Sequence, residues 1–123
     1  MLAQGGAPPG PQKANPAAAH LERGQKLIQS GDLAGALEAF DAAAKADPKD
    51  PRAWYLRGVV LEKRHDASGA ERAYREAVDR DARFAPAHNN LGAMLLGKGE
   101  TGAAEKELQI GRASCRERVS IDV

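Results

Sequence analysis

The feature that most constrains this chain is an internal repeat with a period of 34 residues. Glycines lie at positions 24, 58 and 92, and alanines lie at positions 36, 70 and 104, so that both series advance by the same step. The alanine follows the glycine by twelve residues in every copy. A fixed period of this length is typical of stacked supersecondary units that share one continuous core. The repeat therefore points to an interaction scaffold.

Length and composition favour a small helical protein. The 123 residues suffice for at most one small domain, and hydrophobic residues make up 42% of them but aromatic residues only 4%. Alanine supplies much of the apolar share, which suits closely packed helices, and few β-branched runs exist from which strands could form. The 18 lysines and arginines nearly balance the 17 acidic residues, which gives no electrostatic case for binding nucleic acid or an anionic membrane. No apolar run approaches the roughly 20 residues that span a bilayer.

Residues 1–16 are expected to form a disordered linker rich in proline and glycine, and Asn15-Pro16 is expected to begin the first helix. The segment Met1–Gln4 is too short for a signal peptide, although it would fit the end of one whose start lay upstream. Cytoplasmic and periplasmic or secreted locations therefore both stay open.

From residue 17 the chain divides into units 17–50 and 51–84 and an incomplete unit 85–109. The first half of each unit is apolar at helical spacing, and a break then separates it from a second helix. The breaks are Gly31-Asp32, His65-Asp66 and Gly99-Glu100, helix starts are expected at Asp50-Pro51 and around Pro86, and Asp47-Pro48 ends the first unit.

These hairpins resemble the tetratricopeptide repeat family. The family pattern is an aromatic residue, Leu-Gly, tyrosine, alanine, a second aromatic residue and a late proline. The matching positions are Gly24, Ala36, Phe40, Ala43 and Pro48 in unit one, Trp54, Gly58, Ala70, Tyr74 and Ala77 in unit two, and Leu91, Gly92, Ala104 and Leu108 in unit three. The resemblance implies an all-α, right-handed superhelical solenoid of antiparallel helix hairpins.

The pattern also predicts how the hairpins pack. Gly24 and Ala36 are expected to face each other across one hairpin, where a larger side chain would force the helices apart. Large residues at positions 40, 74 and 108 are expected to fill the space between neighbouring hairpins. The sequence departs from the family at several places: His20 and His88 take the position of Trp54, Arg23 and Arg57 replace leucine, and Ala82 replaces the late proline. Both histidines are expected to pack where Trp54 packs.

The repeat pattern stops after Leu108, because Gly111 and Cys115 stand where the earlier units carry alanine and aspartate. The tail from Ile110 to Val119 back-translates to ATC GGA AGA GCG TCG TGT AGG GAA AGA GTG, which resembles the adapter ligated to DNA fragments in short-read sequencing. Our hypothesis is that residues 110–123 are not native and that the native sequence is truncated at about Gln109. The alternative is a native basic tail, and codons other than those above in the nucleotide record would establish it.

No motif for catalysis, cofactor binding or metal binding is found. His65 and Asp66 are adjacent on a turn and do not converge on one point, and the three histidines lie on different units. The chain has no P-loop, no G-x-G-x-x-G and no G-x-S-x-G motif. Opposite charges four residues apart, Glu71 with Arg75 and Arg72 with Glu76, are expected on an exposed helix face. The sequence predicts no enzyme activity, no cofactor, no metal and no small-molecule substrate.

The resemblance implies a partner-binding groove lined by the first helix of each unit. In this family ligands contact positions four and eight residues after the unit start, and the same face continues further along the helix. The corresponding residues are Leu21, Gln25, Ile28, Tyr55, Val59, Glu62, Asn89, Ala93 and Leu96. Tyr55 would offer an aromatic surface and Asn89 an amide able to bond a peptide backbone. The alternative is that these positions are merely exposed or lie at interfaces.

One subtype of the family is disfavoured. Repeats that grip the C-terminal carboxylate of a chaperone carry lysine, arginine and asparagine at these groove positions, whereas this chain carries mainly apolar residues, which cannot satisfy a buried carboxylate. We expect a protein–protein interaction scaffold that binds an extended or helical segment of a protein or peptide. Two other hypotheses stay open: a regulatory or substrate-docking segment of a larger enzyme such as a glycosyltransferase, and a secreted or lipid-anchored assembly factor.

Overall fold

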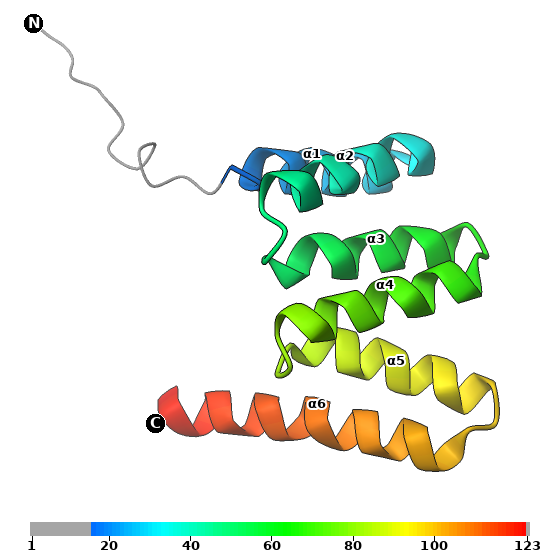
Figure 1. Cartoon of the computed structure of the whole chain (residues 1–123), viewed down its shortest axis with the longest axis vertical. Helices are drawn as coiled ribbons and strands as arrows, with labels where there is room; N and C mark the ends of the chain where they lie inside the picture. Colours follow the sequence, from blue (N-terminus) through cyan, green and yellow to red (C-terminus); the bar gives the residue numbers. More distant parts are fainter. Residues whose placement is uncertain (1–15, 123) are drawn as a thin grey trace, which may run out of the picture.

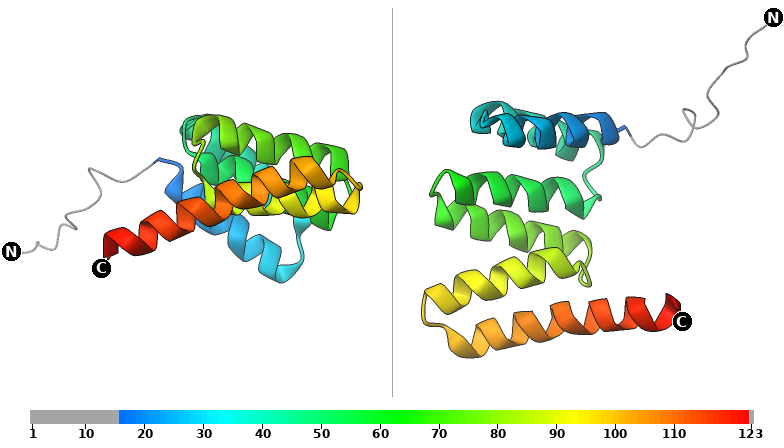
Figure 2. Two further views of the ribbon diagram at one scale, coloured as in Figure 1. Left: turned by 90° about the horizontal axis from the view of Figure 1, so that it is seen from below. Right: turned by 180° about the vertical axis from the view of Figure 1, so that it is seen from behind.

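Three antiparallel helix hairpins stack one over the next in the computed structural model, which describes residues 16–122 and the side chains of residues 16–114 (Figure 1). The helices are α1 (Ala18–Ser30), α2 (Leu33–Ala46), α3 (Pro51–Lys63), α4 (Ala67–Arg80), α5 (Ala85–Gly97) and α6 (Thr101–Asp122). No strand occurs in this part of the chain. Seen from below, each hairpin is turned relative to the next (Figure 2). The expected all-α superhelical solenoid is confirmed.

Aspartate side chains begin three of the helices. Asp32, Asp50 and Asp66 each accept a backbone N–H from the first turn of α2, α3 and α4, at N···O distances of 2.9, 3.0 and 3.0 Å. Each carboxylate thus satisfies one of the N–H groups that a helix start leaves without an intrahelical partner. The predicted starts at Asp50-Pro51 and around Pro86 are confirmed.

The first helix begins later than predicted. Its first residue is Ala18, and Ala17 at the capping position has no side-chain hydrogen bond. Pro16 therefore lies before α1 and not in its first turn, because the chain at 16 and 17 is still a turn. Asn15 and the rest of the expected linker lie outside the described residues.

The three hairpin turns share one backbone conformation. Gly31 and Gly99 have φ angles of 87° and 83°, in the left-handed region that glycine adopts without strain. His65 occupies the equivalent position in the second hairpin with a φ of 66°, so a β-carbon is held there in a conformation that disfavours it. The repeat period thus predicts the position of this turn but not its residue.

The repeated glycines lie against the large residue of the second helix in their own hairpin. A β-carbon on Gly24 would lie 2.5 Å from the Phe40 ring, one on Gly58 would lie 2.6 Å from the Tyr74 ring, and Gly92 faces Leu108 at the same 2.6 Å. In the third hairpin a β-carbon on Gly92 would also lie 3.2 Å from the carbonyl oxygen of Ala104, which is the repeat equivalent of Ala36. That Gly24 faces Ala36 stays a prediction. The large residues do not sit only between hairpins, because each one fills the space inside its own hairpin.

The other repeat positions form the core as expected. Ala36, Ala43, Ala70, Ala77 and Ala104 are completely buried, together with the rings of positions 40 and 74. Small side chains at these places let the two helices of a hairpin approach closely, which is how an alanine-rich sequence builds a dense interior. Leu91 and Gly92 are buried in the third hairpin, whereas Trp54 and Leu108 are half-buried and Pro48 is exposed.

His88 packs where Trp54 packs, as predicted. The indole Nε1–H of Trp54 donates to the carbonyl oxygen of Pro48 at 3.2 Å, and the Nε2 of His88 lies 2.7 Å from the carbonyl oxygen of Ala82, which is the equivalent position one period later. The second ring nitrogen of His88 lies 2.7 Å from the Glu107 carboxylate. His20 is only half-buried, and the carbonyl that would correspond in its unit lies outside the described residues.

The arginine that replaces the family leucine in unit two joins two hairpins. Arg57 on α3 donates to the Asp41 carboxylate on α2 at 2.7 Å. At this interface an ion pair between units one and two thus takes the place of the family's apolar leucine.

Helix α6 continues without a break beyond residue 109. Gly111 is buried against the side chain of Asn89, and a β-carbon there would overlap the Asn89 amide oxygen. The expected boundary at residues 109 and 110 therefore falls inside a helix. The origin of residues 110–123 stays a hypothesis that the nucleotide record tests.

Candidate partner-binding face

An apolar hollow of about 250 Å³ lies between α1 and α3, on the face built by the first helices of the hairpins. Its lining residues are Leu21, Gln25, Arg52, Tyr55, Leu56 and Phe84. Three of the residues predicted to bind a partner, Leu21, Gln25 and Tyr55, therefore come together at one place. We refer to this space as the apolar hollow.

Aromatic rings that contact one another form part of the wall of the apolar hollow. The Tyr55 ring meets Phe84 edge-on, with ring centroids 5.7 Å apart, and lies 5.8 Å from the Tyr74 ring. Phe84 comes from the loop before α5, so the wall is shared by the second and third hairpins. Aromatic pairs at such distances add favourable contact energy beyond the burial of their surfaces. Phe84 lines the apolar hollow, and the repeat pattern did not indicate it.

The single cation that lines the apolar hollow is neutralised by its neighbour. Arg52 donates from Nη2 to the Asp50 carboxylate at 2.6 Å and from Nε at 3.0 Å. The hydrogen bond with Asp50 raises the pKa of Arg52, against a smaller opposing effect of burial. A guanidinium paired in this way offers little charge to a bound carboxylate.

A polar cluster connects α3, α4 and α5 beneath the same face. The Tyr74 hydroxyl donates to the Glu62 carboxylate and accepts a hydrogen bond of 3.0 Å from the Asn90 amide. Burial raises the pKa of Tyr74 well above its usual value, and the hydrogen bond to Glu62 raises it further. Tyr74 is completely buried, whereas Glu62 is exposed at the surface. A tyrosine where unit one carries phenylalanine is the signal in the sequence that indicates this cluster.

A second hollow, of about 580 Å³, lies between the turn ends of the second and third hairpins. We call it the turn hollow; its lining residues are Glu62, His65, Ala67, Ser68, Glu71, Met94 and Lys98. Of these, only Glu62 belongs to the predicted binding residues.

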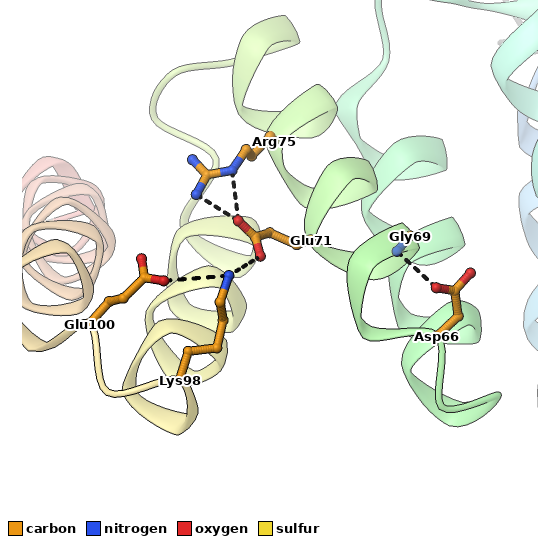
Figure 3. A network of polar contacts seen from close by, with 6 residues as sticks. All are labelled: Asp66, Gly69, Glu71, Arg75, Lys98 and Glu100. Atoms are coloured by element: carbon orange, nitrogen blue, oxygen red, sulfur yellow. Dashed lines mark hydrogen bonds and ion pairs between the residues drawn. The ribbon is translucent and has the colours of Figure 1, made fainter.

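Ion pairs surround the turn hollow (Figure 3). Glu71 accepts from Arg75 at 2.9 Å and from Lys98 at 3.0 Å, and Lys98 also lies 3.5 Å from Glu100. The hydrogen bond from Arg75, followed by that from Lys98, lowers the pKa of Glu71. The predicted pair of Glu71 and Arg75 is confirmed, but Glu76 pairs with Arg80 and not with Arg72.

The remaining predicted residues lie outside both hollows. Ile28 and Val59 are half-buried and pack against the two core clusters, and Asn89 is exposed beside α6. Ala93 is exposed, and Leu96 keeps 50% of its surface accessible. The structure thus brings together two of the three predicted residues of α1 and one from the start of α3, and it leaves those of α5 apart.

Metal-binding clusters and membrane-spanning helices are absent from the described part of the chain. No group of three or more histidine, cysteine, aspartate or glutamate side chains lies close enough there to hold a metal ion. Among the same residues, no helix is long and apolar enough to cross a membrane.

Stacked helix hairpins with a period of 34 residues define a helical repeat protein of the solenoid class. The family model of the tetratricopeptide repeat matches residues 21–70 and 60–114. The chain belongs to the tetratricopeptide repeat family.

Several known proteins are similar to this chain. DnaJ homolog subfamily C member 3 of Bos taurus is 32% identical over 90 residues, which cover 73% of this chain and 18% of the relative. The crystal structure of the P58(IPK) TPR domain is 31% identical, with a TM-score of 0.76 over 80% of this chain and 27% of that one. The second TPR of Spaghetti (RPAP3), bound to the HSP90 peptide SRMEEVD, is 19% identical, with a TM-score of 0.74 over 83% of this chain and 94% of that one. This chain therefore spans about a fifth of the length of the DnaJ relative.

Proposed function

We propose that this chain is an interaction scaffold whose first-helix face binds an extended segment of a partner protein. The observation that carries the proposal is the apolar hollow between α1 and α3, because three residues at the family's binding positions line it together. A concave apolar site with a few polar groups at its rim is the usual form of a binding site. Gln25 and the Asp50-bound Arg52 supply those polar groups.

A structural neighbour supports the same role. The RPAP3 repeat domain, which shares the fold, was solved with an HSP90 peptide bound. That peptide, SRMEEVD, ends in an acidic residue and carries two more just before its valine. In this chain the cation at the apolar hollow is already neutralised by Asp50, so we infer a partner with an apolar anchor residue instead of an anchoring carboxylate.

The proposal is tested by selecting short peptides from a random library displayed on phage, with the purified full chain as bait. Gln25→Trp fills the apolar hollow from an exposed position and should leave the fold intact, whereas Lys45→Ala is a control on the exposed surface of α2. We expect selected peptides to bind the wild type and the control equally and to lose binding to Gln25→Trp. Peptides that bind all three proteins with equal affinity would show that the apolar hollow is not the binding site.

A further inference from the structure

We propose that the first-helix face selects partner segments that carry a lysine or arginine three residues from an apolar anchor, with Glu62 as the carboxylate that recognises the basic side chain. The inference rests on the proposed function and adds to it the chemical class of the partner. It is carried by the placement of Glu62 and Tyr55 on one helix and by the charges around the turn hollow.

The spacing along α3 sets the spacing in the partner. Tyr55 and Glu62 are seven residues apart, and positions i and i+7 lie on one face of a helix. A rise of about 1.5 Å per residue separates them by roughly 10 Å along the axis. A segment in the extended polyproline II conformation advances about 3.1 Å per residue with three residues per turn, so its residues i and i+3 lie on one face and roughly 9 Å apart. An apolar side chain in the apolar hollow then places the third residue beyond it near Glu62.

The Glu62 carboxylate is held in position from below. One of its oxygens accepts the hydroxyl of Tyr74, and that tyrosine is fixed in turn by the Asn90 amide and by contact with the Tyr55 ring. Tyr74 is completely buried, so this support cannot swing away. The Tyr74 ring therefore contacts Tyr55 in the apolar hollow, and its hydroxyl orients the Glu62 carboxylate. One buried residue thus connects the two ends of the site.

Glu62 keeps its charge available. Among the described side chains no lysine or arginine forms an ion pair with it. Lys98, which lines the same hollow, binds Glu71 instead and also lies near Glu100. Two carboxylates, Glu62 and Glu71, and one lysine, Lys98, line the turn hollow, so its lining carries one more carboxylate than ammonium group.

The turn hollow also fits the shape of a basic side chain. Met94 and Ala67 line it with apolar surface, beside the carboxylate of Glu62. Lysine and arginine bury their methylene stems along such surface while the charged end reaches a polar partner. A neutral polar side chain would contact the apolar surface without the attraction between opposite charges, and an acidic side chain would be repelled by Glu62.

The experiment compares selections from a random peptide library on four full-length proteins: wild type, Glu62→Gln, Glu62→Lys and the control Glu38→Gln. Glu38 is an exposed carboxylate on α2 that lines neither hollow. The amide introduced by Glu62→Gln keeps an oxygen that accepts the Tyr74 hydroxyl, so the fold is preserved, which far-ultraviolet circular dichroism checks. We expect the peptides selected on wild type and on Glu38→Gln to carry an apolar residue, with lysine or arginine three positions before or after it. Glu62→Gln should lose the basic preference, and Glu62→Lys should select aspartate or glutamate at that place.

Affinities of one enriched peptide give the size of the effect. Exchange of its basic residue for norleucine should weaken binding to the wild type by about fivefold, as for a partly exposed ion pair, and should leave binding to Glu62→Gln unchanged. Added salt should reduce the difference on the wild type.

The outcomes separate the inference from the proposed function. The role of Glu62 is overturned, and the binding face is retained, if peptides that lose binding to Gln25→Trp show no preference for a basic residue. The same conclusion follows if peptides selected on Glu62→Gln still show that preference. Peptides whose binding is unaffected by Gln25→Trp overturn both, because the apolar anchor is then absent.

Discussion

The close contact between Gly58 and the Tyr74 ring leads to a prediction about stability. A β-carbon at Gly58 would lie 2.6, 2.7 and 3.1 Å from three carbons of that ring. The ring must therefore move by roughly 1 Å to reach the ~3.5 Å of an ordinary carbon contact. Glu62, Asn90 and the Tyr55 ring hold it where it is. Gly58→Ala should therefore destabilise the hairpin although alanine is the better helix former.

The magnitude follows from two opposing terms. Alanine in place of glycine inside a helix stabilises by about 1 kcal/mol. Overpacking of a well-filled core costs about 1–3 kcal/mol. We expect a net loss of about 1 kcal/mol for Gly58→Ala. Gly58→Leu adds three more carbons to the same contact and should unfold the array.

Urea unfolding followed by far-ultraviolet circular dichroism measures this difference. The matched control is Gly102→Ala on α6, where a β-carbon would meet nothing within 4 Å. This control should gain stability, by up to about 1 kcal/mol, because only the helix term applies. The reasoning is refuted if Gly58→Ala is as stable as Gly102→Ala, since the Tyr74 ring would then yield without cost.

Three further predictions concern residues that depart from the repeat or from ordinary titration. His65→Gly should raise the free energy of unfolding by about 1 kcal/mol, and with it the urea midpoint, because glycine relieves the left-handed backbone at φ 66°. An unchanged midpoint would contradict that strain. His88→Leu should reduce the free energy of unfolding by about 2 kcal/mol and lower the melting temperature, because the Glu107 carboxylate and the Ala82 carbonyl lose their partner. His20 is only half-buried, so His20→Leu should have little effect. The raised pKa of Tyr74 means that its neutral form is favoured by folding, so its contribution to stability is complete below about pH 10 and is lost as the pH rises further. An ultraviolet titration should show one phenol that ionises late, absent from Tyr74→Phe, and two early phenols in the wild type would refute this.

Local signals in the sequence predicted the helices well. These signals act through the backbone or through one neighbouring helix, so residue spacing alone predicts them. They are Asp50-Pro51, the turns at Gly31 and Gly99, and the buried alanines. The start of α1 was predicted too early, because a proline is compatible with a first turn but does not by itself create one.

The family pattern predicted only part of the lining of the apolar hollow. Leu21, Gln25 and Tyr55 were expected from the family pattern and line one hollow. Arg52 and Leu56 on α3 and Phe84 from the loop before α5 complete it. Position 89 follows the same pattern, yet Asn89 lies beside α6 and outside both hollows. Whether two such positions share a site depends on the angle between successive hairpins, and no residue pattern within one unit encodes that angle.

The period of 34 residues by itself determined the class of fold, because small residues at fixed intervals permit only close-packed hairpins that stack. Only the tertiary structure decided the partners across helices: which ring each glycine accommodates, and that Tyr74 supports Tyr55 and Glu62 together. The physical reason is that the residues repeated in every unit are those that each unit needs for its own packing. The chemistry of the surface arises instead between units, where side chains from different hairpins meet.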